Sequence, residues 1–182
     1  MLRINYVPIS RRNSFGRFDQ DFQVGMPLSW KDKLRSETKR FLDISEWANP
    51  IAATLTCKKA RHDGWSIEYA NPIKCSKNLR HVLNILKKKT NQRRPLPVVA
   101  VLEQAGDGRY HYHLAIDAPK RCCPDWFCSV LEEAWRKSFW GHRETCCKKA
   151  DRGWIHYITK LRGKKDFGDA IDWQNVNLSI DS

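Results

Sequence analysis

The sequence predicts an α+β fold in which a central antiparallel sheet has helices packed on one face. Runs of β-forming residues lie on either side of a turn near residue 107, which predicts a hairpin. Two segments, within 76–89 and 124–140, carry apolar residues at helical spacing. The full order of strand, helix, hairpin, helix, strand, helix is accommodated by helices on one face of the sheet, which leaves the other face open.

The chain divides into a basic arm, one folded domain and a polar tail. Residues 1–27 are rich in polar and basic side chains and are expected to be irregular. Residues 28–163 form the domain, and residues 164–182 form the tail. The domain begins with an amphipathic pattern over 28–47, which predicts a helix that ends before Pro50.

The first half of the domain contains two expected strands and a helix. Residues 51–56 predict the first strand of the core, and residues 65–69 predict a second strand after a turn at 61–64. The next helix is expected to begin with Ser76 as its N-cap and to end in the lysines at 87–89. Its apolar face is predicted to contain Leu79, Val82, Leu83 and Leu86.

The second half of the domain predicts two helices and an edge strand. Pro124 suits the first position of a helix that runs to about Trp140. Residues 143–148 favour an edge strand, and Gly153 and Gly163 bound the last helix. Side chains expected in the core are Phe127, Val130, Leu131, Ala134, Trp135 and Phe139.

The hairpin between these halves carries the most informative residues. If its turn centres on Asp107, residues equally far from Asp107 face each other, so Glu103 lies opposite His111. Because side chains alternate along a strand, Glu103, His111 and His113 share one face. The opposite face is predicted to carry Leu102, Tyr112 and Leu114.

Two imidazoles and a carboxylate on one face suit a divalent catalytic metal, Mg²⁺ or Mn²⁺. We therefore predict that Glu103, His111 and His113 are metal ligands. Gln104 is an alternative ligand, but it points to the opposite face in this register. The alternative for the histidines is an ordinary polar surface.

A second pair of chemically useful residues lies downstream, in the last helix. Tyr157 and Lys160 are three residues apart, so they occupy one side of a helix. A tyrosine attacks a group that is polarised when a cation stabilises its phenolate. Lys160 would stabilise the phenolate or orient a phosphate. The alternative is a core tyrosine beside a solvated lysine.

The charge of the chain points to an anionic partner. The formal net charge is +13, and eight Trp, seven Phe and five Tyr are interleaved with the basic residues. Single-stranded DNA is bound by this mixture of cations and aromatic rings. The candidate phosphate contacts are Lys88, Arg93, Arg94 and Lys164. For the basic stretch 87–94, an ordinary solvated helix end is the alternative.

Several classes of protein are disfavoured by composition. No apolar run is long enough to span a membrane, and the first residues lack an apolar secretion signal, so a cytoplasmic protein without a membrane partner is expected. Seven cysteines without a Cys-x-x-Cys pair favour reduced thiols. A zinc site lacks normal spacing, although its ligands would be Cys122 or Cys123, Cys128, His142 and Cys146.

Taken together, the motifs resemble those of the HUH endonucleases, specifically the single-tyrosine initiators of rolling-circle replication. The first motif is Ala53-Thr54-Leu55-Thr56, a strand ending in threonine. The second is His111-Tyr112-His113, with Glu103 as third ligand, and the third is Tyr157-Ile158-Thr159-Lys160. The resemblance covers residues 51–163 and implies a ferredoxin-like, RRM-like core.

The resemblance also implies a reaction. Tyr157 would attack a scissile phosphate at the metal and become joined to the DNA 5′ end, releasing a 3′ hydroxyl that primes synthesis. The implied partner is single-stranded DNA at a replication origin, with a host helicase and polymerase, because the chain has no phosphate-binding Gly-x-x-x-x-Gly-Lys-Ser/Thr loop. The alternatives are a transposase or relaxase of the same chemistry, a hydrolase that uses water, and a non-catalytic nucleic-acid binder.

Overall fold

The computed structural model describes most of the expected domain and a short segment of the expected tail. The described residues are 36, 44, 46–62, 64–151, 153–159 and 170–178. The predicted arm, nearly all of the predicted helix at 28–47, and Lys160, Gly163 and Lys164 lie outside them. The domain boundaries at 27 and 163 stay a prediction.

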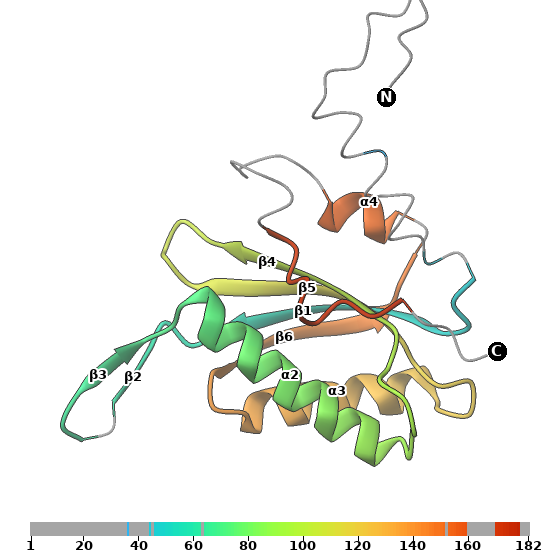
Figure 1. The fold of residues 1–182 in the computed structure, drawn as a ribbon, viewed down its shortest axis with the longest axis horizontal. Helices are drawn as coiled ribbons and strands as arrows, with labels where there is room; N and C mark the ends of the chain where they lie inside the picture. The colour runs from blue at the N-terminus through green and yellow to red at the C-terminus, as the bar shows by residue number, and fades with distance from the viewer. Residues whose placement is uncertain are drawn as a thin grey trace, which may run out of the picture.

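A four-stranded antiparallel sheet forms the centre of the molecule, in the spatial order β4-β5-β1-β6 (Figure 1). Its strands are β1 (Pro50–Cys57), β4 (Val98–Gln104), β5 (Tyr110–Asp117) and β6 (Gly141–Lys149). The strands predicted at 51–56 and 143–148 and the predicted hairpin are all present, and β6 is an edge strand as expected. The α+β fold class is therefore confirmed.

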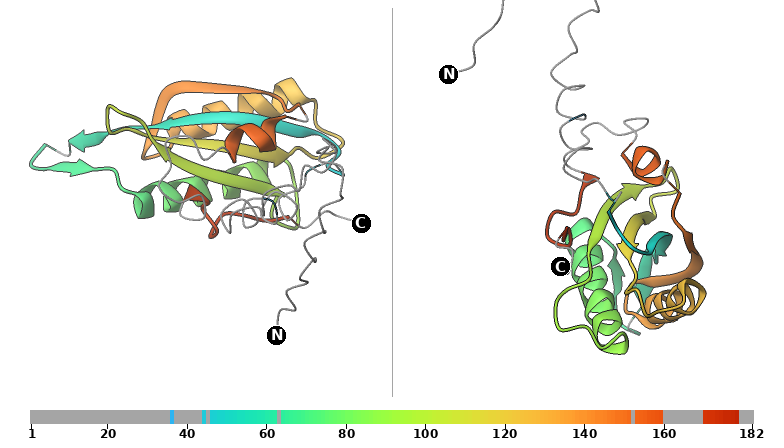
Figure 2. Two further views of the ribbon diagram at one scale, coloured as in Figure 1. Left: turned by 90° about the horizontal axis from the view of Figure 1, so that it is seen from above. Right: turned by 90° about the vertical axis from the view of Figure 1, so that its right-hand side faces the viewer.

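Two long helices, α2 (Pro72–Lys89) and α3 (Pro124–Lys137), cover one face of this sheet (Figures 1 and 2). Each helix has an apolar stripe, and these stripes pack on the inward side chains of β1 and β5. The core predictions for both helices are confirmed, except for Phe139. Fully buried helix residues include Leu79, Val82, Leu86, Phe127, Leu131 and Trp135.

The start of α2 differs from the prediction. The N-cap is Asn71, whose side-chain oxygen accepts a hydrogen bond from the Lys74 backbone N–H at 2.9 Å, and Pro72 follows at the first helical position. Ser76 therefore lies inside the helix, where it is buried and its hydroxyl donates to the Asp172 carboxylate at 3.0 Å. Asn-Pro was the stronger start signal.

The end of α3 also differs. The helix ends at Lys137 rather than near Trp140, because the chain becomes extended at Ser138 and enters β6 at Gly141. A Cβ on Gly141 would lie 1.7 Å from the Trp135 carbonyl oxygen, so the turn requires glycine. This turn directs Trp140 into the protein and leaves Phe139 55% exposed, so the prediction of a core Phe139 was wrong.

A separate hairpin of two short strands follows β1. It consists of β2 (Ala60–His62) and β3 (Ile67–Tyr69), and it projects away from the central sheet (Figure 1). The strand predicted at 65–69 is limited to 67–69. The turn predicted at 61–64 is also wrong in its extent, because residues 61 and 62 pair within β2. The sequence pattern did not show that this hairpin stands outside the core.

The opposite face of the sheet carries a smaller cover. The short helix α4 (Trp154–Ile158) lies on it (Figure 2). Ile155 and Ile158 of α4 pack in a second apolar cluster with Val99, Val101 and Ala115 of the sheet. A helix of this length depends on such packing for its stability. The remaining buried members of this cluster are Trp47 and Ile171.

Residues 170–178 lie along the edge of β4. Ile171 and Asn177 form β-bridges with Val101 and Val98, which covers an edge strand that would otherwise be open to pairing. The Tyr112 hydroxyl donates to the Asp172 carboxylate at 2.7 Å. Burial and the neighbouring carboxylate raise the pKa of Tyr112. No helix in the described ranges is long and apolar enough to cross a membrane.

Candidate active site on the sheet

The predicted register of the β4–β5 hairpin is confirmed. Glu103 pairs with His111, and Val101 pairs with His113. The turn closes with a hydrogen bond from the Ala105 N–H to the Arg109 carbonyl at 2.8 Å. Glu103, His111 and His113 therefore share the face that carries α4. The predicted inward residues Leu102, Tyr112 and Leu114 belong to the main core on the other side.

Both histidines are held by threonines of the neighbouring strand β1. The Thr54 hydroxyl lies 3.1 Å from His113 Nδ1, and the Thr56 hydroxyl lies 3.0 Å from His111 Nδ1. These pairs are directly opposite one another in the sheet. With Nδ1 engaged, Nε2 is the nitrogen of each ring that is left for a ligand, and the ring orientation is set.

The carboxylate of Glu103 completes a set of metal-ligand types on this face. Its Oε2 is 3.5 Å from His113 Nε2, and the two side chains are 35% and 12% exposed. Burial lowers the pKa of His111, and the positive charges of Arg109 and His113 lower it further. A neutral imidazole at neutral pH is the form that binds a metal.

These donors fit a divalent ion by type and by register. Two imidazoles and one carboxylate occupy adjacent cross-strand positions, as a site with open coordination positions requires. In the described part of the chain, no three His, Cys, Asp or Glu side chains stand close enough to hold a metal ion as they are placed. Binding would therefore have to draw His111 and Glu103 together.

Helix α4 fixes the position of Tyr157 on the same face. Ile155 and Ile158 anchor the helix, and the Trp154 indole N–H donates to the Leu114 carbonyl at 2.8 Å. The Trp154 ring is stacked on the Tyr157 ring, with centroids 5.2 Å apart and an interplanar angle of 17°. Tyr157 is thus supported on one side by a tryptophan that is itself tied to β5.

The predicted meeting of Tyr157 with the histidine pair is confirmed. The rings of Tyr157 and His113 have centroids 5.8 Å apart at an angle of 90°, and Tyr157 is 47% exposed. Their catalytic and metal-binding roles stay predictions. Lys160, the predicted cationic partner, lies outside the described residues.

A groove of about 500 Å³ runs beside Tyr157, between β1, β6 and α4. Thr54 of β1 lies on one side of it, and Cys146 and Lys148 of β6 lie on the other. Lys148 adds a cation close to the phenol, which suits a phosphate group. Sequence reasoning missed Lys148 because it stands in an edge strand with many charges.

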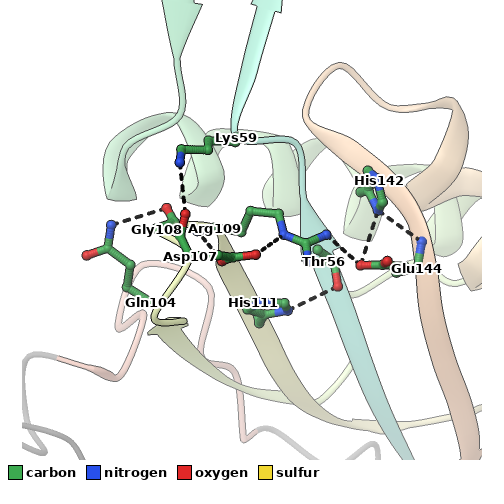
Figure 3. A network of polar contacts seen from close by, with 9 residues as sticks. All are labelled: Thr56, Lys59, Gln104, Asp107, Gly108, Arg109, His111, His142 and Glu144. Atoms are coloured by element: carbon green, nitrogen blue, oxygen red, sulfur yellow. Dashed lines mark hydrogen bonds and ion pairs between the residues drawn. The ribbon is translucent and has the colours of Figure 1, made fainter.

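A chain of ion pairs borders His111 (Figure 3). Arg109 binds the carboxylates of Asp107 and Glu144, each at 2.6 Å, and His142 Nδ1 lies 3.6 Å from Glu144. Hydrogen bonds from Arg109 to these two carboxylates raise the pKa of its guanidinium. The network is exposed, so it contributes little stability, but it links the turn to β6 beside the candidate ligands.

The predicted phosphate contacts lie away from this site. Arg93 and Arg94 line an open hollow of about 520 Å³ together with Lys120 and Arg121, and Lys88 is in the last turn of α2. This hollow is near the Asp117 end of β5, roughly 20 Å along the strand from His111. Lys164 lies outside the described residues. The nucleic-acid role of all four residues stays a prediction.

Other residues of the face were recognised only in part. Thr54 and Thr56 were noted as a motif, but their role was missed, although their two-residue spacing matches that of His111 and His113. Trp154 carried no signal in the sequence. The seven cysteines are all free. Within the described residues, the cysteines and histidine of the possible zinc site are not grouped closely enough to hold a metal ion.

Comparison with known families supports the same part of the chain. A family model for the replication-associated protein ORF2 matches residues 50–166. The chain belongs to this replication-associated family. The match begins with β1 and extends past α4, so it contains the histidine pair and Tyr157. No curated protein and no solved structure matches the chain significantly.

Proposed function

We propose that this member of the replication-associated family is a metal-dependent enzyme of the HUH type that nicks and joins single-stranded DNA. It forms a 5′-phosphotyrosine intermediate and initiates rolling-circle replication of a plasmid or phage. The observation that carries the proposal is the contact between the Tyr157 ring and His113, one of two histidines that threonines hold on the same face.

The metal in this proposal is Mg²⁺ or Mn²⁺, held by Glu103, His111 and His113. When bound, such an ion polarises a scissile phosphate oxygen as a Lewis acid. The chain prepares the ligands, because Thr54 and Thr56 orient the imidazoles before the metal arrives.

Tyr157 is the proposed nucleophile. Its phenolic oxygen forms a bond to phosphorus while the bond from phosphorus to the 3′ oxygen breaks. The phenol loses its proton and the departing 3′ oxygen gains one, which leaves a free 3′ hydroxyl. Because one phosphoester replaces another, a later 3′ hydroxyl can reverse the step and join the strand. Lys160 is proposed to orient or neutralise the phosphate.

The groove beside Tyr157 offers a path for the DNA strand. Lys148 lies in this groove, where it can contact a phosphate next to the scissile one. Trp154 keeps the phenol ring from turning away, since the two rings are stacked. Positioning of the reacting groups supplies a large part of catalysis in phosphoryl transfer.

The proposed partner is single-stranded DNA at a replication origin. Lys88, Arg93, Arg94 and Lys164 are proposed to contact phosphates outside the cleavage site. A host helicase and polymerase would open and copy the DNA, because this chain carries no phosphate-binding loop of its own. The family match favours replication over the transposase or relaxase alternative.

The test is the formation of a covalent adduct. The protein is incubated with labelled single-stranded origin DNA and Mn²⁺ and then analysed on a denaturing gel. We expect a protein–DNA band that is lost in Tyr157→Phe and with a chelator. Tyr110→Phe is the matched control, because Tyr110 is also on the hairpin strand but points to the other side of the sheet.

Two results would refute the proposal in different ways. Cleavage that persists in Tyr157→Phe and leaves no protein on the DNA would indicate water as the nucleophile. Binding without any cleavage, at several metal concentrations, would indicate a non-catalytic nucleic-acid protein.

A further inference from the structure

The exposed apolar side chains of this protein are concentrated around the β2–β3 hairpin. Eight large hydrophobic residues are exposed within the described ranges, and five of them lie on the hairpin or against its base. These five are Trp65, Ile67, Tyr69, Ile73 and Phe139. An exposed apolar patch of this kind marks a binding surface.

The base of the hairpin is fixed to three other parts of the fold. The Lys58 N–H donates to the Trp140 carbonyl at 2.8 Å, which ties the hairpin to the loop before β6. Lys59 Nζ donates to the Asp107 carbonyl at 2.9 Å, which ties it to the β4–β5 turn (Figure 3). Lys74 of α2 binds Glu68 at 3.0 Å. The hairpin is therefore held in a set direction.

The outer part of the hairpin has no core of its own. Trp65, between the two strands, is 100% exposed, and Tyr69 and Ile67 are 59% and 51% exposed. Two isolated strands are marginally stable in water. Packing inside the protein therefore gives no reason for aromatic and aliphatic side chains here, whereas a ligand that covers them would.

Cations surround these side chains. The Arg61 guanidinium lies 3.4 Å from the centroid of the Phe139 ring, and Lys58 donates to the Phe139 carbonyl at 3.4 Å. Lys59 also donates to a backbone carbonyl, and such a contact does not neutralise the charge of a lysine. Flat rings next to cations match a ligand with flat bases and a phosphate chain.

We infer that the β2–β3 hairpin binds single-stranded DNA, with bases stacked on Trp65 and Tyr69 and phosphates near Arg61 and Lys59. The inference rests on the proposed function, because it places this DNA next to the cleavage site. Thr56, which holds His111, is nine residues before Trp65, so the two sites are at most about 30 Å apart. One DNA strand can therefore contact both.

The test compares the affinity of the full chain for two single-stranded oligonucleotides in the presence of Mn²⁺. The short one covers only the cleavage site, and the long one adds about ten nucleotides on each side, which is within the site size of one single-strand-binding fold. We expect Trp65→Ala and Tyr69→Ala each to weaken binding of the long oligonucleotide roughly 5- to 30-fold, as loss of a stacked base does. Binding of the short oligonucleotide and adduct formation with it are expected to stay unchanged.

The matched control is Trp126→Ala. Trp126 is 45% exposed on α3, away from the hairpin, so its loss is expected to leave both affinities unchanged. The unfolding temperature of each variant shows whether it is folded. Because the substituted side chains are exposed, no change in that temperature is expected.

Three results would overturn the inference. The first is a wild-type affinity for the long oligonucleotide in both hairpin variants. The second is an equal loss of affinity for duplex DNA of the same sequence, which would assign the hairpin to duplex recognition. The third is a loss of self-association without a loss of DNA affinity, which would assign it to a second copy of the chain. Absence of the adduct with intact stacking effects would refute only the proposed nicking reaction.

Discussion

The two faces of the central sheet differ in what they are made of, although the same strands supply both. On the covered face, Tyr112 and Leu114 of β5 are fully buried beneath α2 and α3. On the opposite face, the neighbouring residues His111 and His113 are partly exposed and bonded to threonines. Strand alternation thus separates the residues that hold the fold from the residues proposed for chemistry.

This separation means that stability and activity can be changed independently, one face at a time. The covered face depends on apolar volume, so a deletion there creates a cavity. The open face depends on specific polar pairs and on the contact between α4 and the sheet, so a deletion there removes a donor or a ligand. Adjacent residues of a single strand are the sharpest places to test the difference.

The largest effect is expected for His113→Ala. Loss of this ring removes a proposed metal ligand and the edge contact with Tyr157. The single-turnover rate of adduct formation should fall at least about 1,000-fold, or about 4 kcal/mol, while the unfolding free energy changes by less than about 1 kcal/mol. Rapid-quench kinetics and urea unfolding measure the two quantities. A small rate effect would remove His113 from the mechanism.

The next effect is expected for Leu114→Ala, one residue away on the covered face. Leu114 is fully buried in the main core, so its truncation should lower the unfolding free energy by about 2–5 kcal/mol. Urea unfolding measures the loss. Where the variant is folded, the adduct should form at the wild-type rate. A rate loss as large as that of His113→Ala would show that the two faces are not separable.

The smallest effect is expected for Thr56→Val, which keeps the shape of the side chain but removes the hydroxyl that holds His111. The Mn²⁺ concentration that supports half-maximal adduct formation should rise roughly tenfold, as for loss of a residue that orients a metal ligand. A metal titration measures it. The control is Thr145→Val on β6, opposite Leu55, which should leave the titration unchanged. Equal midpoints for all three proteins would refute the positioning role.

Local sequence signals were sufficient for the hairpin that carries the candidate site. Turn residues around Asp107 and two alternating strands set the register, and that register decides which side chains share a face. They were insufficient at Ser76 and Phe139. At Ser76 a nearby Asn-Pro pair supplied a stronger helix start, and at Phe139 the close contact of Gly141 with Trp135 reversed the chain.

The candidate site was predictable only in its ingredients. Glu103, His111 and His113 followed from strand geometry, and Tyr157 followed from its motif. The threonine partners, the Trp154 ring and Lys148 in the groove come from β1, α4 and β6, and no local rule connects those segments. The β2–β3 hairpin was also beyond local rules, since its short strands look like any others.

The sequence by itself determined the strand and helix order, the pairing of Glu103 with His111, and the basic character that selects an anionic partner, because these depend on neighbours along the chain and on total charge. Only the tertiary structure decided that α4 lies on the sheet with Tyr157 against His113. That contact joins residues far apart in the chain, and it exists because apolar side chains on α4 and on β4 and β5 must be removed from water together.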